Sequence, residues 1–194
     1  SGKSTFLRTV GVNLCLAQAG GVVNAASLRT NPVRLFTCIQ VSDSLSDGIS
    51  YFYAEVRRLK ALLQAMQEKS DYPVFFMIDE IYRGTNNRER RIGSQAYIRA
   101  LAGYCSVGLV STHDLELVKL ADQEPSNDAL DRSGANILNY HFREEVIAER
   151  MVFDYRLRPG PCPTTNALRI MALEGLPVDQ ATGVDPADEG AENW

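Results

Sequence analysis

A run of five consecutive apolar residues, VFFMI at positions 74–78, constrains the fold of this 194-residue chain more than any other feature. It follows Pro73 and ends in two acids, Asp79 and Glu80. Uninterrupted apolar runs of strand length are typical of strands buried on both faces, as in parallel sheets covered by helices. The run therefore predicts a central strand of an α/β domain, with Asp79 and Glu80 at its carboxyl end.

The segments on either side of this run alternate between helical and strand patterns. Strands separated by helix-length crossovers imply a mostly parallel sheet flanked by helices. Apolar spacing predicts helices over residues 4–19, about 52–66 and about 88–103, and strands over residues 33–41 and 107–112.

The last third of the chain has a different pattern. Residues 137–142 and 151–157 resemble two strands joined through the charged residues 143–145, which predicts an antiparallel pair at the edge of the sheet. Residues 164–173 have the spacing of a short helix, and Gly175 is a typical helix stop.

Charge is distributed unevenly along the chain, which has 20 basic and 24 acidic residues. Without the last sixteen residues the balance is 20 basic to 19 acidic, so composition alone favours no broad nucleic-acid-binding face. With 45% hydrophobic residues, residues 1–178 are sufficient for one globular domain, and residues 179–194 are predicted to be a disordered acidic tail. The acids of this tail are Asp179, Asp185, Asp188, Glu189 and Glu192.

Two further classes of protein are disfavoured by the sequence. No stretch approaches eighteen uninterrupted apolar residues, and the chain does not open with a charged segment followed by an apolar one. We therefore expect a cytoplasmic protein without a membrane partner.

The cysteines form no C-x-x-C pair and lie in or beside apolar stretches, so we expect reduced and mostly buried thiols at Cys15, Cys38, Cys105 and Cys162.

The chain opens with Ser1 and then Gly2-Lys3-Ser4-Thr5, which matches the second half of a phosphate-binding loop, G-x-x-x-x-G-K-[ST]. In such a loop, N–H groups at a helix start and the lysine hold phosphates, and the serine hydroxyl binds Mg²⁺. The tripeptide alone arises by chance in about one chain in ten of this length, so the following helix adds weight. Because the first glycine of the loop and the strand before it would precede Ser1, we expect the chain to be a fragment.

The acids that end the apolar strand match the second half of such a site. At a strand end beside a phosphate loop, Asp79 would lie near Mg²⁺, and Glu80 would orient and deprotonate an attacking water. Thr112 and His113 follow the next strand and reach the same edge, where His113 suits a sensor of the γ-phosphate. The alternative readings are solvated surface acids and a structural histidine.

A serine-rich segment, SLSDGIS at residues 44–50, directly precedes the second predicted helix. Glycine and serine at a helix start offer free N–H groups and hydroxyls, which bind anions or simply cap the helix. Since the chain already has one phosphate loop, a second anion site at Gly48 and Ser50 makes most sense if it completes the nucleotide site of another copy.

Together these motifs resemble the ATPase domain of the MutS family, the DNA mismatch repair ATPases, which form a branch of the ABC-type ATPases. The resemblance runs from Ser1 to about Asp179. It is carried by GKSTFLR at the start, SLSDGISYFYAE at 44–55, IDEIYRGT at 78–85, STHD at 111–114 and NYHF at 139–142.

The resemblance implies a P-loop NTPase fold of the ABC type and DNA-dependent hydrolysis of ATP with Mg²⁺. It also implies a composite dimer in which each copy binds ATP with its own loop and borrows Ser50, with Gly48 beside it, from the second copy. In this family pattern Glu80 is the catalytic base, Asp79 the Mg²⁺ carboxylate and His113 the switch histidine.

The same resemblance assigns roles near the end of the chain. His141 matches a family position that packs near the adenine, although a half-buried strand residue is the simpler reading. Residues 164–173 and 175–177 resemble a helical element that packs across the dimer. DNA would be contacted through domains that precede residue 1.

The loop after the two acids departs from the family pattern. Repair members typically have IGRGTSTYDG after the acids, whereas this chain has IYRGTNNRERR at residues 81–91. Tyr82 replaces a glycine, which is typical of MutS-related side branches. The arginines of this loop either form a solvated helix start or contact DNA phosphates or the other subunit; they are Arg83, Arg88, Arg90 and Arg91.

Three other functions remain to be compared. A phosphate-loop kinase for a small molecule would need an acceptor pocket and would not need the serine-rich segment. A non-catalytic scaffold derived from such an ATPase would not need Lys3, Asp79 and Glu80. Another ABC-type subunit, such as that of a transporter, would be expected to contain LSGGQ, which this sequence lacks.

Overall fold

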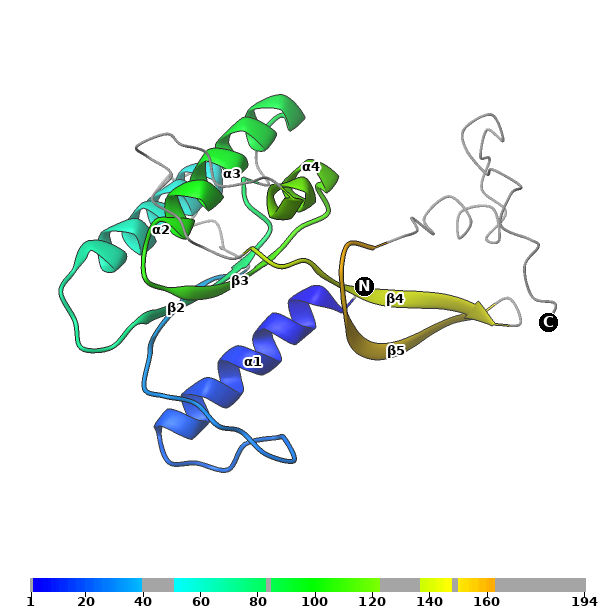
Figure 1. Ribbon diagram of the computed structural model, residues 1–194, viewed down its shortest axis with the longest axis horizontal. Coiled ribbons are helices and arrows are strands. Elements are labelled where there is room, and N and C mark those ends of the chain that lie inside the picture. Colours follow the sequence, from blue (N-terminus) through cyan, green and yellow to red (C-terminus); the bar gives the residue numbers. More distant parts are fainter. Residues whose placement is uncertain (1, 40–50, 83–84, 123–136, 148–149, 163–194) are drawn as a thin grey trace.

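The alternation of strands and helices expected for an α/β protein is confirmed. The computed structural model describes residues 2–39, 51–82, 85–122, 137–147 and 150–162. These form a three-stranded parallel sheet, a separate two-stranded antiparallel sheet and the helices around them (Figure 1). In chain order the elements are α1 (Lys3–Gln18), β1 (Arg34–Cys38), α2 (Tyr51–Gln67), β2 (Val74–Asp79), α3 (Asn87–Ala102), β3 (Val107–Ser111), α4 (Leu115–Val118) with a 3-10 turn at Lys119–Asp122, β4 (Tyr140–Ile147) and β5 (Arg150–Pro159).

The apolar run at residues 74–78 forms β2, the middle strand of the parallel sheet. It pairs with β1 on one side and with β3 on the other, and the order is β1-β2-β3. The strand is buried along most of its length, as its sequence predicts. At its carboxyl end Asp79 lies opposite Ser111 of β3, so both strands end at the same edge of the sheet.

Helices cover both faces of this sheet, with α1 on one side and α2 and α3 on the other (Figure 1). Alternate residues of β2 therefore face different helices. Phe76 and Ile78 belong to the core cluster under α2 and α3, whereas the side chain of Met77 reaches α1, where a methyl group on Gly11 would lie 2.6 Å from its Cε. Asp79 shares the α1 face with Met77, which brings its carboxylate to the beginning of that helix.

The core cluster under α2 and α3 explains why the two amphipathic sequences form helices that pack on one face. Tyr97 of α3 donates a hydrogen bond from its hydroxyl to the carbonyl oxygen of Leu59 in α2, at 2.8 Å. This bond joins the two helices. The buried members of the cluster are Cys38, Leu59, Leu62, Val74, Phe76, Ile78, Ile81, Tyr97 and Leu101.

The antiparallel pair at the end of the chain differs from the prediction in two respects. In the described residues, β4 and β5 form their own sheet and do not extend the parallel one, so the expected antiparallel edge is wrong. The expected turn at residues 143–145 is also wrong, because β4 continues to Ile147. A register shift between Phe142 and Glu144 interrupts the alternation of side chains along β4. The sequence of this β-bulge therefore resembles that of a turn.

Ring packing explains where this hairpin lies. The ring of Phe142 contacts that of Phe6 in α1 edge-on, with 5.6 Å between the centroids. Asn139, just before β4, donates from Nδ2 to the carbonyl oxygen of Val118, at 2.8 Å. These contacts place the hairpin beside the first turns of α1 rather than along the sheet (Figure 1).

The cysteines are all free thiols, but the expectation that they are mostly buried is wrong. Cys38 is buried in the core cluster, whereas the other three are exposed, because they lie on outward-facing positions beside apolar stretches.

Within the described part of the chain, no helix has both the length and the apolar character needed to cross a membrane. The serine-rich segment with Gly48 and Ser50, the predicted helix at 164–173 and the predicted tail at 179–194 lie outside the described residues.

The sheet itself offers a test of this packing at Gly108. Gly108 in β3 lies opposite Phe76 of β2, and a methyl group there would overlap the Phe76 ring. We expect Gly108→Ala to destabilise the protein by about 1–3 kcal/mol, because the ring has to leave its place in the core. Equilibrium unfolding in urea measures this loss.

The matched control is Gly103→Ala at the end of α3. Its φ of −73° suits alanine, and the nearest atom to an added methyl group is a carbonyl oxygen at 3.4 Å. This variant is expected to stay within about 0.5 kcal/mol of wild type. Equal losses for the two variants would contradict the packing described here.

Candidate active site

A buried carboxylate joins α1 to the two strands that end at the same edge. Asp79 is only 5% exposed, and its Oδ1 accepts a hydrogen bond from the Ser4 hydroxyl at 2.9 Å. The hydroxyl of Ser111 donates to the same oxygen. The predicted phosphate-loop serine and the first predicted acid are therefore in direct contact, although 75 residues separate them in the sequence.

The start of α1 has the features expected of a phosphate-binding helix. Gly2 adopts a left-handed backbone with φ of 87°, which favours glycine, and its carbonyl accepts from the N–H of Phe6. The first turn contains no acid. The N–H groups of this turn have no partner within the helix, so the residues from Gly2 to Thr5 present donors and the positive end of the helix dipole.

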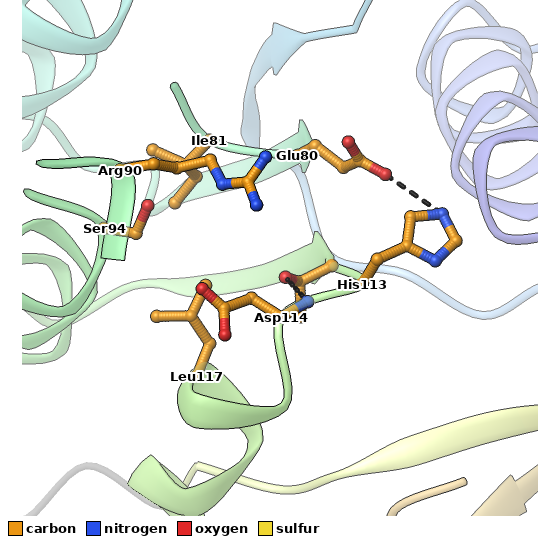
Figure 2. A pocket seen from close by; sticks show the side chains of 8 residues that line it. Glu80, Ile81, Arg90, Ser94, His113, Asp114 and Leu117 are labelled. Atoms are coloured by element: carbon orange, nitrogen blue, oxygen red, sulfur yellow. Dashed lines mark hydrogen bonds and ion pairs between the residues drawn. The ribbon is translucent and has the colours of Figure 1, made fainter. Parts of the chain in front are cut away.

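A histidine connects the lysine of this turn to the second predicted acid. Nε2 of His113 lies 3.0 Å from Oε1 of Glu80, and Nδ1 of His113 lies 3.4 Å from Nζ of Lys3. Figure 2 shows the Glu80 and His113 side chains pointing toward each other. Because an ammonium group only donates, Nδ1 accepts here, and the ring proton lies on Nε2 and is donated to Glu80. Lys3, His113 and Glu80 thus form one polar chain at the sheet edge.

The backbone at Glu80 is strained. Its φ is 58°, a left-handed conformation that is unusual for a residue with a side chain, and it costs about 1–3 kcal/mol. The N–H of Glu80 nevertheless continues the sheet ladder by donating to the carbonyl oxygen of Ser111 at 3.0 Å. The ladder holds the backbone while the left-handed turn directs the carboxylate toward His113.

A cavity of about 60 Å³ lies next to Glu80, between the ends of β2 and β3 and the helices α3 and α4 (Figure 2). Ser94 is fully buried there, and its hydroxyl has no hydrogen-bond partner among the described residues. A polar cavity of this size has room for about two water molecules. Its lining consists of Glu80, Ile81, Arg90, Ser94, Thr112, His113, Asp114 and Leu117.

The arginines near this site occupy different environments. Arg88 and Arg91 are exposed at the start of α3, as a solvated helix start requires, whereas Arg90 is half-buried and lines the cavity. Arg83 lies outside the described residues. The helix starts at a regular cap, because the Asn86 side chain accepts from the N–H of Glu89 at 3.0 Å.

His141 is placed on the hairpin and not within the chain formed by Lys3, His113 and Glu80. Its Nδ1 donates to the carbonyl oxygen of Gly160 at 3.0 Å. The neighbouring Phe142 contacts Phe6 of α1, which sets this part of β4 beside the first turns of that helix. The hydrogen bond of His141 thus lies within the hairpin, and its role near the adenine stays a prediction.

The sequence patterns assign no role to three buried polar residues near the site. Ser94 and Ser111 look like ordinary small residues in a helix and a strand. Glu55 carries a detectable signal, because it interrupts the apolar face of α2 formed by Phe52 and Leu59. It is 1% exposed, and its Oε1 accepts from the N–H of Tyr82 at 2.6 Å.

A lysine, two acids and a histidine at the carboxyl edge of a parallel sheet define a candidate nucleotide site in an α/β domain. The family model of MutS domain V matches residues 1–186. The DNA mismatch repair protein MutS of Natronomonas pharaonis is 32% identical over 194 aligned positions, which cover 97% of this chain and 20% of that protein. The chain belongs to the MutS family, and the matched part is its ATPase domain. It spans about a fifth of the length of this relative.

The double hydrogen bond to Asp79 gives a test that is independent of activity. Ser111→Ala removes a hydroxyl donor from a buried carboxylate, and we expect a loss of about 1.5–3 kcal/mol in the free energy of unfolding. Ser111→Thr keeps the hydroxyl in a strand that favours β-branched residues, so its loss is expected to be smaller by at least half. Urea unfolding compares the two, and equal losses would show that this bond does not stabilise the fold.

Proposed function

We propose that this chain binds ATP and hydrolyses it to ADP and phosphate as the ATPase domain of a MutS-like DNA mismatch repair protein. The observation that carries the proposal is the meeting of Lys3, Ser4, Asp79, Glu80 and His113 at one edge of the sheet. These are the residues that the phosphate-loop and acidic-strand patterns select, and they come from three distant parts of the sequence. The family membership supports the same activity.

The N-terminal turn of α1 would bind the phosphates. Its N–H groups and helix dipole favour anions, and the Lys3 ammonium adds a full positive charge at the same place. Gly2 keeps the backbone open for a close approach, since it carries no side chain. In this proposal a P-loop NTPase fold of the ABC type surrounds the site.

The oxygens of Ser4 and Asp79 fit Mg²⁺. They lie 2.9 Å apart, and hydroxyl and carboxylate oxygens are the donors that this ion prefers. The described residues contain no group of three or more histidines, cysteines or acids that could hold a metal ion. Mg²⁺ is usually bound by one or two carboxylates together with substrate phosphates. When bound, Mg²⁺ neutralises charge on the β- and γ-phosphates.

Glu80 would act as the general base. Its carboxylate stands at the strand end, where it can accept a proton from the water that attacks the γ-phosphorus as the bond to the ADP oxygen breaks. His113 lies within hydrogen-bond distance of Glu80 and orients this carboxylate through Nε2. Because phosphoryl transfer needs mainly positioning and charge neutralisation, a strained but well-held Glu80 suits this step.

The remaining roles complete the proposal. His141 would pack near the adenine, and the contact between Phe142 and Phe6 supports this by placing β4 beside the phosphate-binding turn. Gly48 and Ser50 would complete the ATP site of a second copy in a composite dimer. ATP turnover would then be coupled to DNA through other domains of the complete protein. The boundary between residues 178 and 179 stays a prediction.

The role of Glu80 is tested by Glu80→Gln in the intact protein. The amide keeps the shape of the side chain but cannot take a proton, so we expect single-turnover hydrolysis to fall about 10²–10⁴-fold. ATP affinity is expected to stay within about threefold of wild type, since Lys3 and Ser4 are unchanged. When the wild-type protein is given ATP labelled in the γ-phosphate, we expect the label to appear in inorganic phosphate.

The control for this variant is Glu116→Gln on α4, an exposed acid whose partner is Lys119. It is expected to hydrolyse ATP at the wild-type rate. Wild-type turnover by Glu80→Gln would remove Glu80 from the role of base. Transfer of the label to a small molecule would instead favour the alternative function of a small-molecule kinase.

The composite dimer is tested by complementation. Lys3→Ala removes phosphate binding and Ser50→Ala removes the residue lent to the other copy, so each variant alone is expected to be inactive. In a random equimolar mixture half of the dimers combine the two variants, and each of these has one complete site of two. The mixture should therefore recover about a quarter of wild-type ATPase activity. Absence of recovery would argue against sites shared between copies.

A further inference from the structure

Glu55 is a buried acid that the proposed chemistry does not use. It lies in the second turn of α2 and is 1% exposed. Burying a carboxylate is costly unless hydrogen bonds compensate, so a residue in this position is expected to have a specific task. Its Oε1 accepts from the backbone N–H of Tyr82 at 2.6 Å, which joins α2 to the segment that follows β2.

Residue 82 is held by α2 at a second point as well. The ring of Tyr82 packs against that of Phe52, with 6.1 Å between the centroids, and Phe52 precedes Glu55 by three residues on the same face of α2. On its other side the ring touches α3, where a methyl group on Gly93 would lie 2.9 Å from Tyr82 Cε2. Burial raises the pKa of the Tyr82 phenol, and the negative charge of Glu55 raises this pKa further.

The backbone at Tyr82 needs such support. Its φ is 58°, as at Glu80, and a bulky residue in the left-handed region costs about 1–2 kcal/mol. Without a partner for its N–H group, residue 82 would be free to return to a common conformation. The hydrogen bond from Glu55 therefore helps to hold a strained turn.

This strained turn includes the proposed base. Glu80 is fixed by the hydrogen bond of its N–H to Ser111, Ile81 is 3% exposed within the core cluster, and Tyr82 is fixed by Glu55. Three consecutive residues are thus held, and the hydrogen bond from Tyr82 to Glu55 lies two residues from the proposed base. The helix that makes this last contact begins at Tyr51, directly after the segment proposed to reach the second copy.

We propose that Glu55 is a positioning residue. It orients the Glu80 carboxylate by fixing the backbone of Tyr82 to α2. The inference rests on the proposed function, because it assigns Glu80 as the base. It ties the direction of this base to α2, the helix that begins directly after the segment proposed to complete the site of the second copy.

Two substitutions separate positioning from a requirement for buried charge. Glu55→Gln keeps an acceptor oxygen at full reach but removes the charge. Glu55→Asp keeps the charge but withdraws the oxygen by one carbon–carbon bond. We expect single-turnover hydrolysis at saturating ATP to stay within about threefold of wild type for Gln and to fall about tenfold to a hundredfold for Asp, because a base displaced by about 1 Å loses rate on this scale.

ATP affinity, measured by equilibrium binding, is the second readout. Because the turn with Lys3 and Ser4 is fixed by Asp79 and not by Glu55, both variants should bind ATP within about threefold of wild type. Thermal melting followed by circular dichroism confirms that each variant is folded. A defect in the hydrolysis step at unchanged affinity is not expected of a residue that only stabilises the fold.

Glu68, just past the end of α2, provides the matched control. It is an exposed acid whose Oε2 lies 2.8 Å from Nη1 of Arg34, and neither Gln nor Asp at this position should change the hydrolysis rate. A Glu55→Asp variant as fast as or faster than Glu55→Gln, or parallel loss of affinity and rate, would overturn the proposal. If the wild-type protein itself did not hydrolyse ATP, the proposed function would fail instead, so the two failures are distinguishable.

Discussion

The hydrogen bonds received by the Asp79 carboxylate are the interaction on which the rest of the structure depends. One comes from Ser4 at the beginning of α1 and another from Ser111 at the end of β3, so a single buried group fixes a helix and two strands relative to one another. Because the carboxylate is almost fully buried, these donors compensate its loss of hydration. The same contacts bring Lys3 within reach of His113. The Asp79 carboxylate therefore holds together both the fold and the candidate site.

Much of this arrangement follows from local patterns in the sequence. The apolar run at 74–78 predicted a central strand, and helical periodicity predicted α1, α2 and α3, because core burial imposes a regular spacing. The meeting of Lys3, Ser4, Asp79, Glu80 and His113 could be expected because strand ends in a parallel sheet gather at one edge. The bulge after Phe142 and the contact of Glu55 with Tyr82 could not, since both depend on partners that are distant in the sequence.

Tyr82 shows how a departure from a family pattern acquires a physical meaning. Repair members typically have glycine at this position, and here the backbone is left-handed, the conformation that glycine adopts without strain. A tyrosine is tolerated because its ring packs against Phe52 and Gly93 and its N–H is bound by Glu55. Tyrosine has less conformational freedom than glycine and adds packing contacts. The turn is therefore expected to be stiffer with Tyr82 than with glycine at this position. The assignment to a MutS-related side branch stays a prediction.

The alternation of side chains along β2 has a consequence for how this sequence can vary. Met77 and Asp79 face α1, whereas Phe76 and Ile78 face the core under α2 and α3. Adding or deleting one residue within the strand would turn the acid away from Ser4 and into the apolar core under α2 and α3. The length of this segment is therefore as tightly constrained as its composition, and changes in length are expected in the connections between the elements.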